Sequence, residues 1–399
     1  MELNEKAYGL GSKRSVIRES CEYGRKRSAE IGAENVFDFS IGNPSVEPPK
    51  AISQTIKQLL KTENSVLLHG YTSAQGDLGT RKAVSDSINK RFGLSLTPDN
   101  IYMTCGAAAS LTISLKAILH PDEECIVFAP FFTEYRVFVE NAGGKLVVSA
   151  PKQNDMQIDL ADFKSKITEN TRAVIINSPN NPSGIVYPSA TIKRVCEILR
   201  AKEKEYGKTI YVIADEPYRE LVYNGVKVPY LMNYYDDTIV CYSYSKALSL
   251  PGERIGYIAV NHAMKDSQSV YLAVCGAGRM LGFVCAPSLF QQVIKHCADA
   301  KVNVKAYKTN RDLLYGALTE YGYDCVKPDG AFYLFVKALG GDAVKFAEKA
   351  REKEILFVPC DDFGVQGYVR IAYCVSYDTI SRALPGFKEL IDEYKERSV

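Results

Sequence analysis

A lysine follows an apolar run in the stretch CYSYSKALSLPGERIGY, residues 241–257. Lys246 stands there among small hydroxyl residues, and Arg254 comes eight positions later. An amine becomes a nucleophile near neutral pH when burial or nearby cations destabilise its protonated form. We expect Lys246 to be such an amine, provided that the fold buries it and brings Arg254 close. Taken alone, it also fits a surface lysine at the start of a helix.

An acid ends another apolar run in TIYVIADEPYREL, residues 209–221. Asp215 closes the run and Tyr218 follows three residues later. A carboxylate at the end of a buried strand suits an anionic partner for a buried cation, such as a protonated heterocyclic nitrogen. The alternative is an acid that caps the following helix.

Two further strand ends carry polar or small residues. In RAVIINSPNNPSG, two prolines and a glycine stiffen the turn and would hold the Asn181 amide against a bound group. In NIYMTCGAAASLTISLKAIL, a strand runs through Gly106, Ala107 and Ala108 into a helix, whose first N–H groups favour a phosphate. Each motif by itself also fits a structural connection, but four such signals at strand ends together favour chemistry.

These strand ends belong to a repeating pattern of short apolar runs and longer helical segments between residues 95 and 260. The pattern indicates βαβ units and an α/β fold whose mostly parallel, seven-stranded sheet is flanked by helices. Ligands of such sheets bind beyond the carboxyl ends of the strands. The runs expected as strands are NIYMT, ECIVFAP, KLVVSA, RAVIIN, TIYVIAD, TIVCYS and RIGYIAV.

The hydrophobic pattern of the sequence changes after Pro287, where one long helical pattern leads into shorter alternating segments. AFYLFVK, DAVKFAEKAREKE, ILFVP and YVRIAYC suggest a smaller α+β domain joined by the N-terminal segment. We therefore predict a large cofactor-binding domain over residues 46–288 and a small domain built from residues 1–45 and 289–399.

Composition favours a small-molecule partner. The 399 residues carry 49 basic and 47 acidic side chains, which gives a net charge of +2 and no bias toward nucleic acid or membranes. The 11 cysteines are scattered and odd in number, and the N-terminus has no apolar core like that of a signal peptide. We predict a reduced, cytoplasmic setting and no metal site.

The motifs together resemble the class I and II aminotransferases, enzymes of fold type I that use pyridoxal 5′-phosphate. The most specific ones are NSPNNPSG, ADEPYREL and SYSKALSLPGERIGY, and the resemblance extends from DFSIGNPSVEPP to YVRIAYC. It implies that Lys246 bonds covalently to the cofactor and then shuttles a proton. Asp215 would keep the ring nitrogen protonated, while Asn181 and Tyr218 would hydrogen-bond the phenolic oxygen of the ring.

The resemblance also assigns the rest of the cofactor site. Phe132 would stack on the ring, since the chain has no tryptophan. Tyr71 would reach the phosphate of a neighbouring subunit, which implies a homodimer with shared active sites. The phosphate itself would be held by Gly106, Ala107, Ala108, Ser243, Ser245 and Arg254.

For the substrate, the resemblance implies that Arg370 clamps the α-carboxylate, helped by Asn181 and the backbone of Gly42. An aspartate-like donor and an aromatic or broad range of donors both stay open. Ala108 stands where an aspartate-specific branch of the family has a lysine. Three other cations are candidates for a distal carboxylate, and each also fits a solvated surface charge: Arg14, Arg18 and Arg279.

The implied activity is an aminotransferase that exchanges an amino group between an L-amino acid and a 2-oxo acid by a ping-pong mechanism. A carbon–sulfur β-lyase of the same fold would share Lys246, Asp215, Tyr218 and Arg370, and differ in needing no 2-oxo acid. A non-catalytic cofactor-binding regulator is the remote alternative, because regulators of this type usually carry an attached DNA-binding domain.

Overall fold

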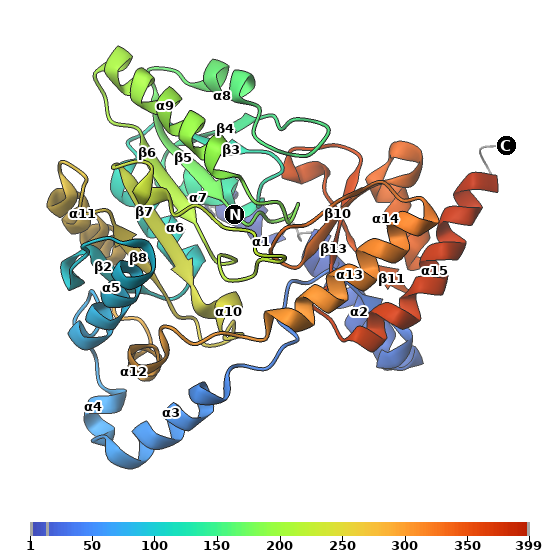
Figure 1. The fold of residues 1–399 in the computed structure, drawn as a ribbon, viewed down its shortest axis with the longest axis horizontal. Helices are drawn as coiled ribbons and strands as arrows, with labels where there is room; N and C mark the ends of the chain where they lie inside the picture. The colour runs from blue at the N-terminus through green and yellow to red at the C-terminus, as the bar shows by residue number, and fades with distance from the viewer. Residues whose placement is uncertain (1–2, 13–15, 397–399) are drawn as a thin grey trace.

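A seven-stranded sheet forms the centre of the larger part of the molecule (Figure 1). The computed structural model describes residues 3–12 and 16–396. Five neighbouring strands, from β7 to β4, pair in parallel, and β8 runs antiparallel to both β2 and β7. In spatial order the strands are β2 (Ile101–Thr104), β8 (Gly256–Val260), β7 (Thr238–Ser243), β6 (Tyr211–Asp215), β5 (Thr171–Asn177), β3 (Glu124–Phe128) and β4 (Lys145–Ser149). The predicted α/β class and all seven predicted strands are confirmed.

Neighbouring residues of a strand point to opposite faces of the sheet, and helices cover both of these faces. Ile213 packs on one face with α6 (Ala107–Ile118), α7 (Glu134–Ala142) and α11 (Ser267–Met280). Val212 packs on the other face, which is covered by α5 (Leu78–Phe92), α8 (Leu160–Lys166), α9 (Ser189–Tyr206) and α12 (Ser288–Cys297). The carboxyl ends of the parallel strands stay free of these layers, so loops can place side chains there.

A second, antiparallel sheet lies in the C-terminal part of the chain, in the order β12-β13-β10-β9. Its strands are β9 (Cys325–Val326), β10 (Tyr333–Lys337), β12 (Val358–Pro359) and β13 (Tyr368–Ala372). The accompanying helices are α13 (Val304–Tyr321), α14 (Ala343–Arg351) and α15 (Tyr377–Glu396).

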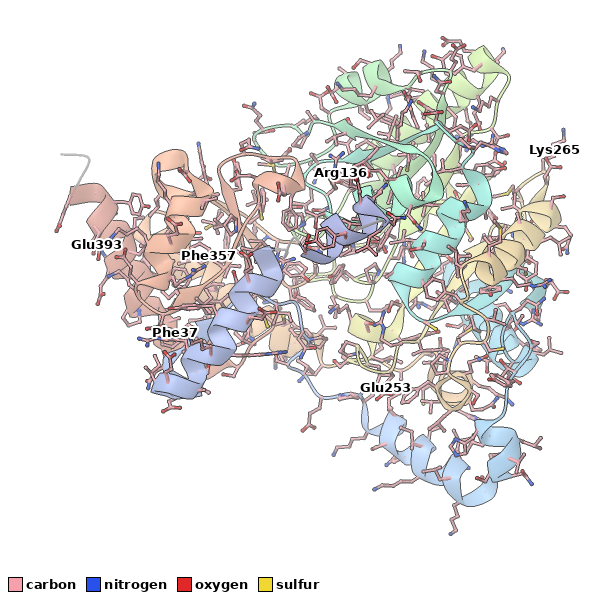
Figure 2. All side chains as sticks on the ribbon, turned by 180° about the vertical axis from the view of Figure 1, so that it is seen from behind. Phe37, Arg136, Glu253, Lys265, Phe357 and Glu393 are labelled. Atoms are coloured by element: carbon pink, nitrogen blue, oxygen red, sulfur yellow. The ribbon has the colours of Figure 1, made fainter. Side chains whose placement is uncertain are left out.

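The N-terminal segment joins this C-terminal part. Strand β1 (Phe37–Asp38) pairs in parallel with β11 (Ile355–Leu356), and α2 (Val16–Ile31) lies on the same side of the molecule. Figure 2 labels Phe37 and Phe357 near each other in this region. The preceding helix α1 (Glu5–Ser12) lies against α7 of the large sheet, where Lys6 pairs with Glu140 at 3.2 Å.

The long helical pattern after Pro287 is two helices rather than one. Helix α12 packs against α3 (Lys50–Thr62) and α5, whereas α13 packs against α15. These contacts place α12 with the helices that cover the large sheet. The predicted division itself stays a prediction.

The remaining helices are α4 (Ser65–His69) and α10 (Tyr244–Ala247). Helices α3 and α4 extend away from the main body at the lower left of Figure 1. Across the described part of the chain, no helix is long and apolar enough to span a bilayer.

Candidate active site

A cavity of about 260 Å³ lies at the carboxyl ends of β5 and β6, where residues of the four-stranded sheet also contribute to its lining. Parallel strands present their carboxyl ends at one edge, so the loops after them converge there. The cavity is lined by Gly42, Ala107, Ala108, Leu111, Phe132, Asn177, Asn181, Asp215, Pro217, Tyr218, Lys246, Tyr333 and Arg370.

Lys246 enters the cavity from α10, the single helical turn directly after β7. The Ser243 side chain caps this turn by accepting a hydrogen bond from the backbone N–H of Ser245 at 3.1 Å. The Nζ atom donates to the carbonyl of Gly42. Burial lowers the pKa of Lys246 to about 8, and the charges of Arg370 and Arg254 act in the same direction. A larger fraction of this amine than of an exposed lysine is therefore neutral and nucleophilic near physiological pH.

Asp215 is buried at the end of β6. One of its carboxylate oxygens accepts hydrogen bonds, and the other has no partner among the described residues. Oδ2 accepts hydrogen bonds from the Tyr135 hydroxyl and, at 3.3 Å, from the Asn177 amide. Oδ1 is equally buried but has no hydrogen-bond partner among the described residues. Burial raises the pKa of Asp215 to about 7. A buried oxygen without a partner is rare in native proteins, so Oδ1 marks the place of a missing donor.

Arg370 approaches the same cavity from β13 and is 2% exposed. Its Nη1 donates to Oδ1 of Asn181 at 3.1 Å and its Nη2 to the Ser40 carbonyl at 2.7 Å. Its Nε is buried without a partner in the part of the chain that is described. The guanidinium is therefore held by neutral acceptors and keeps its charge available for an anion.

Asn181 is fixed from both ends. Its backbone N–H donates to Oδ1 of Asn177 at 2.8 Å, and its side chain accepts from Arg370. Asn177 also donates to the backbone carbonyl of Asp215 at 2.9 Å. One amide side chain therefore connects the ends of β5 and β6 and orients the segment that carries Asn181.

Three aromatic residues complete the lining around Asp215. The hydroxyl of Tyr218 lies 3.0 Å from that of Tyr333. Phe132 is half-buried at the cavity wall, with its ring edge-on to Tyr135 at 5.7 Å. A flat ligand that binds over Asp215 would thus meet an aromatic face and two hydroxyl groups.

A cradle of small groups lies beside Lys246. Gly106 has φ +92°, and a Cβ there would lie 2.7 Å from Nη2 of Arg254. Arg254 donates to the Cys105 carbonyl at 3.1 Å and to Oγ of Ser245 at 3.4 Å, and Ser245 lies 2.8 Å from Oγ of Ser243. Helix α6 begins at Ala107, so its first N–H groups point into this cradle. A cation, hydroxyls and free N–H groups together suit a phosphate.

The remaining candidates from the sequence are Tyr71, Arg279, Arg18 and Arg14. Tyr71 is 99% exposed, so it does not contribute to the cavity of its own chain. Arg279 is exposed near the end of α11 and does not line the cavity. Arg18 lies on α2, and Arg14 lies outside the described residues.

Sequence reasoning missed three residues of the cluster: Asn177, Tyr135 and Tyr333. Asn177 opens the polar turn NSPNNPSG, so its position at a strand end was a usable signal. Tyr135 follows Phe132 by three residues, a spacing that places both near one side of a helical turn. Tyr333 stands inside the apolar run AFYLFVK, which gives no sign of a polar function.

Comparison with known proteins agrees with this geometry. Residues 34–386 match the family described as aminotransferase class I and II. A probable aspartate aminotransferase of Methanocaldococcus jannaschii is 30% identical over 373 residues, 91% of this chain and 95% of that protein. An aromatic-amino-acid aminotransferase of Thermococcus litoralis is 29% identical over 91% of this chain and 94% of its own length.

Solved structures show the same fold. The crystal structure of an amino transferase from Eubacterium rectale superimposes with a TM-score of 0.96 and 54% identity, covering 99% of each chain. The aspartate aminotransferase of Thermus thermophilus with maleate gives a TM-score of 0.86 at 25% identity, covering 98% of this chain and 100% of that one. The chain therefore belongs to the class I and II aminotransferases, a family generally dependent on pyridoxal phosphate, and is a transferase of fold type I.

Proposed function

We propose that this chain binds pyridoxal 5′-phosphate in the cavity and exchanges an amino group between an L-amino acid and a 2-oxo acid in two half-reactions. The observation that carries the proposal is the bare, buried Oδ1 of Asp215, in the same cavity as a lysine of lowered pKa. A ring N–H⁺ is the donor that such an oxygen lacks.

The residues present fit this cofactor. Asp215 would accept from the ring nitrogen, and Asn181 and Tyr218 would hydrogen-bond the phenolic oxygen, with Phe132 stacked on the ring. The cradle would hold the phosphate through Gly106, Ala107, Ala108, Ser243, Ser245 and Arg254. When bound, the cofactor supplies an aldehyde for covalent attachment and an electron-withdrawing ring that stabilises negative charge at the substrate Cα.

The chain's own groups would then perform the following tasks. Lys246, whose pKa is lowered by burial, supplies Nζ first as the nucleophile and then as the base that takes the proton from Cα. Arg370 binds the α-carboxylate with its free N–H groups and thereby orients the Cα–H bond. The Gly42 carbonyl holds Nζ in place until then.

The donor is either aspartate-like or drawn from an aromatic or broad range. Among the described residues that line the cavity, Lys246 and Arg370 are the cations, and both have a task already. A distal carboxylate would therefore need a further cation, for which Arg14, Arg18 and Arg279 are the candidates. Relatives named for aspartate or aspartate/prephenate favour the first option, while one named for aromatic amino acids keeps the second open.

The exposed apolar side chains around α4 support a homodimer with shared sites as part of this proposal. Val66 is 79%, Leu67 80% and Tyr71 99% exposed, on the part that projects in Figure 1. Such large apolar groups side by side suit a partner surface. We propose that a second copy covers them and that Tyr71 reaches the partner's phosphate cradle. The cytoplasmic location stays a prediction.

The test is single-turnover spectroscopy of the cofactor-loaded protein with twenty amino acids, without a 2-oxo acid. Conversion of the cofactor to pyridoxamine phosphate would support transamination and rank the donors at once. Release of pyruvate and ammonia with the cofactor unchanged would instead identify a β-lyase. A protein that takes up cofactor but changes none of the twenty amino acids would reject both enzymes in favour of a binding protein.

A further inference from the structure

Tyr333, the first residue of β10, contacts both Tyr218 and Arg370 in the lining of the cavity. It is 3% exposed, and its side chain lines the cavity together with Tyr218 and Arg370. Its hydroxyl and its ring contact different partners, which allows the two parts of one side chain to be examined separately.

The hydroxyl is paired with a second hydroxyl. Tyr333 and Tyr218 approach to 3.0 Å, and either oxygen is able to donate. A tyrosine hydroxyl has one proton, so Tyr218 cannot donate to Tyr333 and to a ligand at once. If Tyr218 donates to the phenolic oxygen of the cofactor, then Tyr333 must donate to Tyr218. The Tyr333 hydroxyl would then fix the direction of that hydrogen bond and make Tyr218 a stronger donor.

The ring supports the carboxylate clamp. The Cζ atom of Arg370 lies 4.5 Å from the centre of the Tyr333 ring, a cation–π distance. Arg370 is buried and its hydrogen bonds go to the neutral acceptors Asn181 and Ser40, so contacts with aromatic faces help to stabilise its charge. The Phe363 ring is a second such contact but lies farther away, at 5.8 Å. The Tyr333 ring therefore helps to fix the position of the guanidinium at the cavity wall.

The same side chain also explains a glycine. A Cβ on Gly42 would overlap the Tyr333 hydroxyl, so only glycine permits Tyr333 to lie there. The carbonyl of Gly42 in turn accepts the hydrogen bond from Nζ of Lys246. Tyr333 thus packs against the segment that holds the lysine as well as against Tyr218 and Arg370.

We propose that Tyr333 is a positioning residue with two separable functions: its hydroxyl sets the donor direction of Tyr218, and its ring orients Arg370. This inference rests on the proposed function, because the hydroxyl acts through the cofactor's phenolic oxygen. It adds a residue that contacts both Tyr218, proposed to bind the cofactor, and Arg370, proposed to bind the substrate.

The experiment compares Tyr333→Phe, Tyr333→Leu and the control Tyr235→Phe, which removes a buried hydroxyl that donates to the Ile210 carbonyl outside the cavity. The first readout is the pH titration of the visible absorbance of the lysine-bound cofactor, without substrate. A donor to the phenolic oxygen lowers the pKa of that linkage, so Tyr333→Phe should raise it. We expect a change of about two- to tenfold in the ionisation equilibrium, the usual effect of one hydrogen bond.

The second readout is the split between KM and kcat for several amino acids. Tyr333→Phe keeps the ring and should leave KM within about twofold of wild type, whereas Tyr333→Leu should raise KM about tenfold for every donor. Tyr235→Phe should change neither readout. A Tyr333→Phe protein that titrates as wild type would reject the function of the hydroxyl, and equal KM values for the two Tyr333 variants would reject that of the ring. A wild-type protein without the absorbance band would instead reject the proposed function itself.

Discussion

Asp215 and Glu216 are adjacent acids at the end of β6, both buried, and their surroundings differ completely. Glu216 forms an ion pair with Arg219 through both carboxylate oxygens. Arg219 also donates to the carbonyls of Val228 and Pro229 at 3.1 and 3.0 Å. Glu216 and Arg219 therefore have their partners within the described part of the chain.

Asp215 faces the cavity and has no cation beside it among the described residues. Its Oδ1 is bare, and its nearest partners are the neutral donors Tyr135 and Asn177. Arg370 shows the same incompleteness, with a free Nε and neutral acceptors. Burying a charge without a partner costs stability, so a chain retains such groups where a ligand completes them. The paired acid serves the fold and the unpaired one the ligand.

The largest expected effect comes from the group that nothing in the chain replaces. Lys246→Ala should lower turnover by ~10⁴-fold or more, because the nucleophile and the base are one amine. Steady-state rates and borohydride trapping of the cofactor check this, with the exposed Lys265→Ala, labelled in Figure 2, as the matched control. A cofactor adduct still trapped on the Lys246→Ala protein would refute the assignment.

Substitution of Asp215 should mainly affect turnover, and substitution of Glu216 should mainly affect stability. Asp215→Asn should lower kcat by ~10³-fold while the protein stays as stable as wild type, because a costly buried carboxylate is removed. Glu216→Gln should lower the free energy of unfolding by ~3–5 kcal/mol, since Arg219 loses its counter-ion, and leave kcat within about threefold. Kinetics and denaturant unfolding of both variants would overturn the comparison if the two effects were exchanged.

Arg370 should act on binding. Arg370→Ala should raise KM by ~10²-fold for every amino acid tested, because a buried charged hydrogen bond to the common carboxylate is lost. Arg370→Lys is the matched variant, and it should recover little, since an ammonium cannot bind a carboxylate in the same two-point geometry. A KM change confined to acidic donors would instead indicate that Arg370 binds the distal carboxylate of the donor.

The smallest effect concerns pH and sharpens the contrast at Asp215. Burial raises its pKa to about 7 from an ordinary value near 3.8, so the cofactor-free native protein binds more protons than the unfolded chain. Its contribution to stability is present below pH ~4 and is lost as pH rises through ~7. Melting temperature should therefore fall over this range by ~2 °C or more relative to Asp215→Asn. Parallel melting curves for the two proteins would contradict the raised pKa.

Much of the fold and part of the site follow from local sequence. The seven strands are predicted because each is a short apolar run between turn residues, a signal carried by its own positions. Lys246, Asp215 and Asn181 follow such runs, so their meeting at one edge of the sheet is predictable as well. The residues missed are those whose role depends on a distant partner.

Local pattern fails where a choice depends on packing between remote segments. The helical pattern after Pro287 reads as continuous, yet α12 and α13 separate because each packs on a different layer. Tyr333 looks like a core residue in an apolar strand, and becomes part of the site because β10 lies beside β13, which carries Arg370.

Local sequence is sufficient to predict the strands, their ends and the types of chemical group placed there, because periodicity and turn chemistry act over a few residues. Which of the two acids at the end of β6 lacks a charged partner depends instead on how distant segments pack. Tyr135 comes from α7, 80 residues before Asp215, while the partner of Glu216 stands three residues after it. Burial and unpaired atoms are properties of the assembled packing, so the atoms that define the site become visible only in the folded chain.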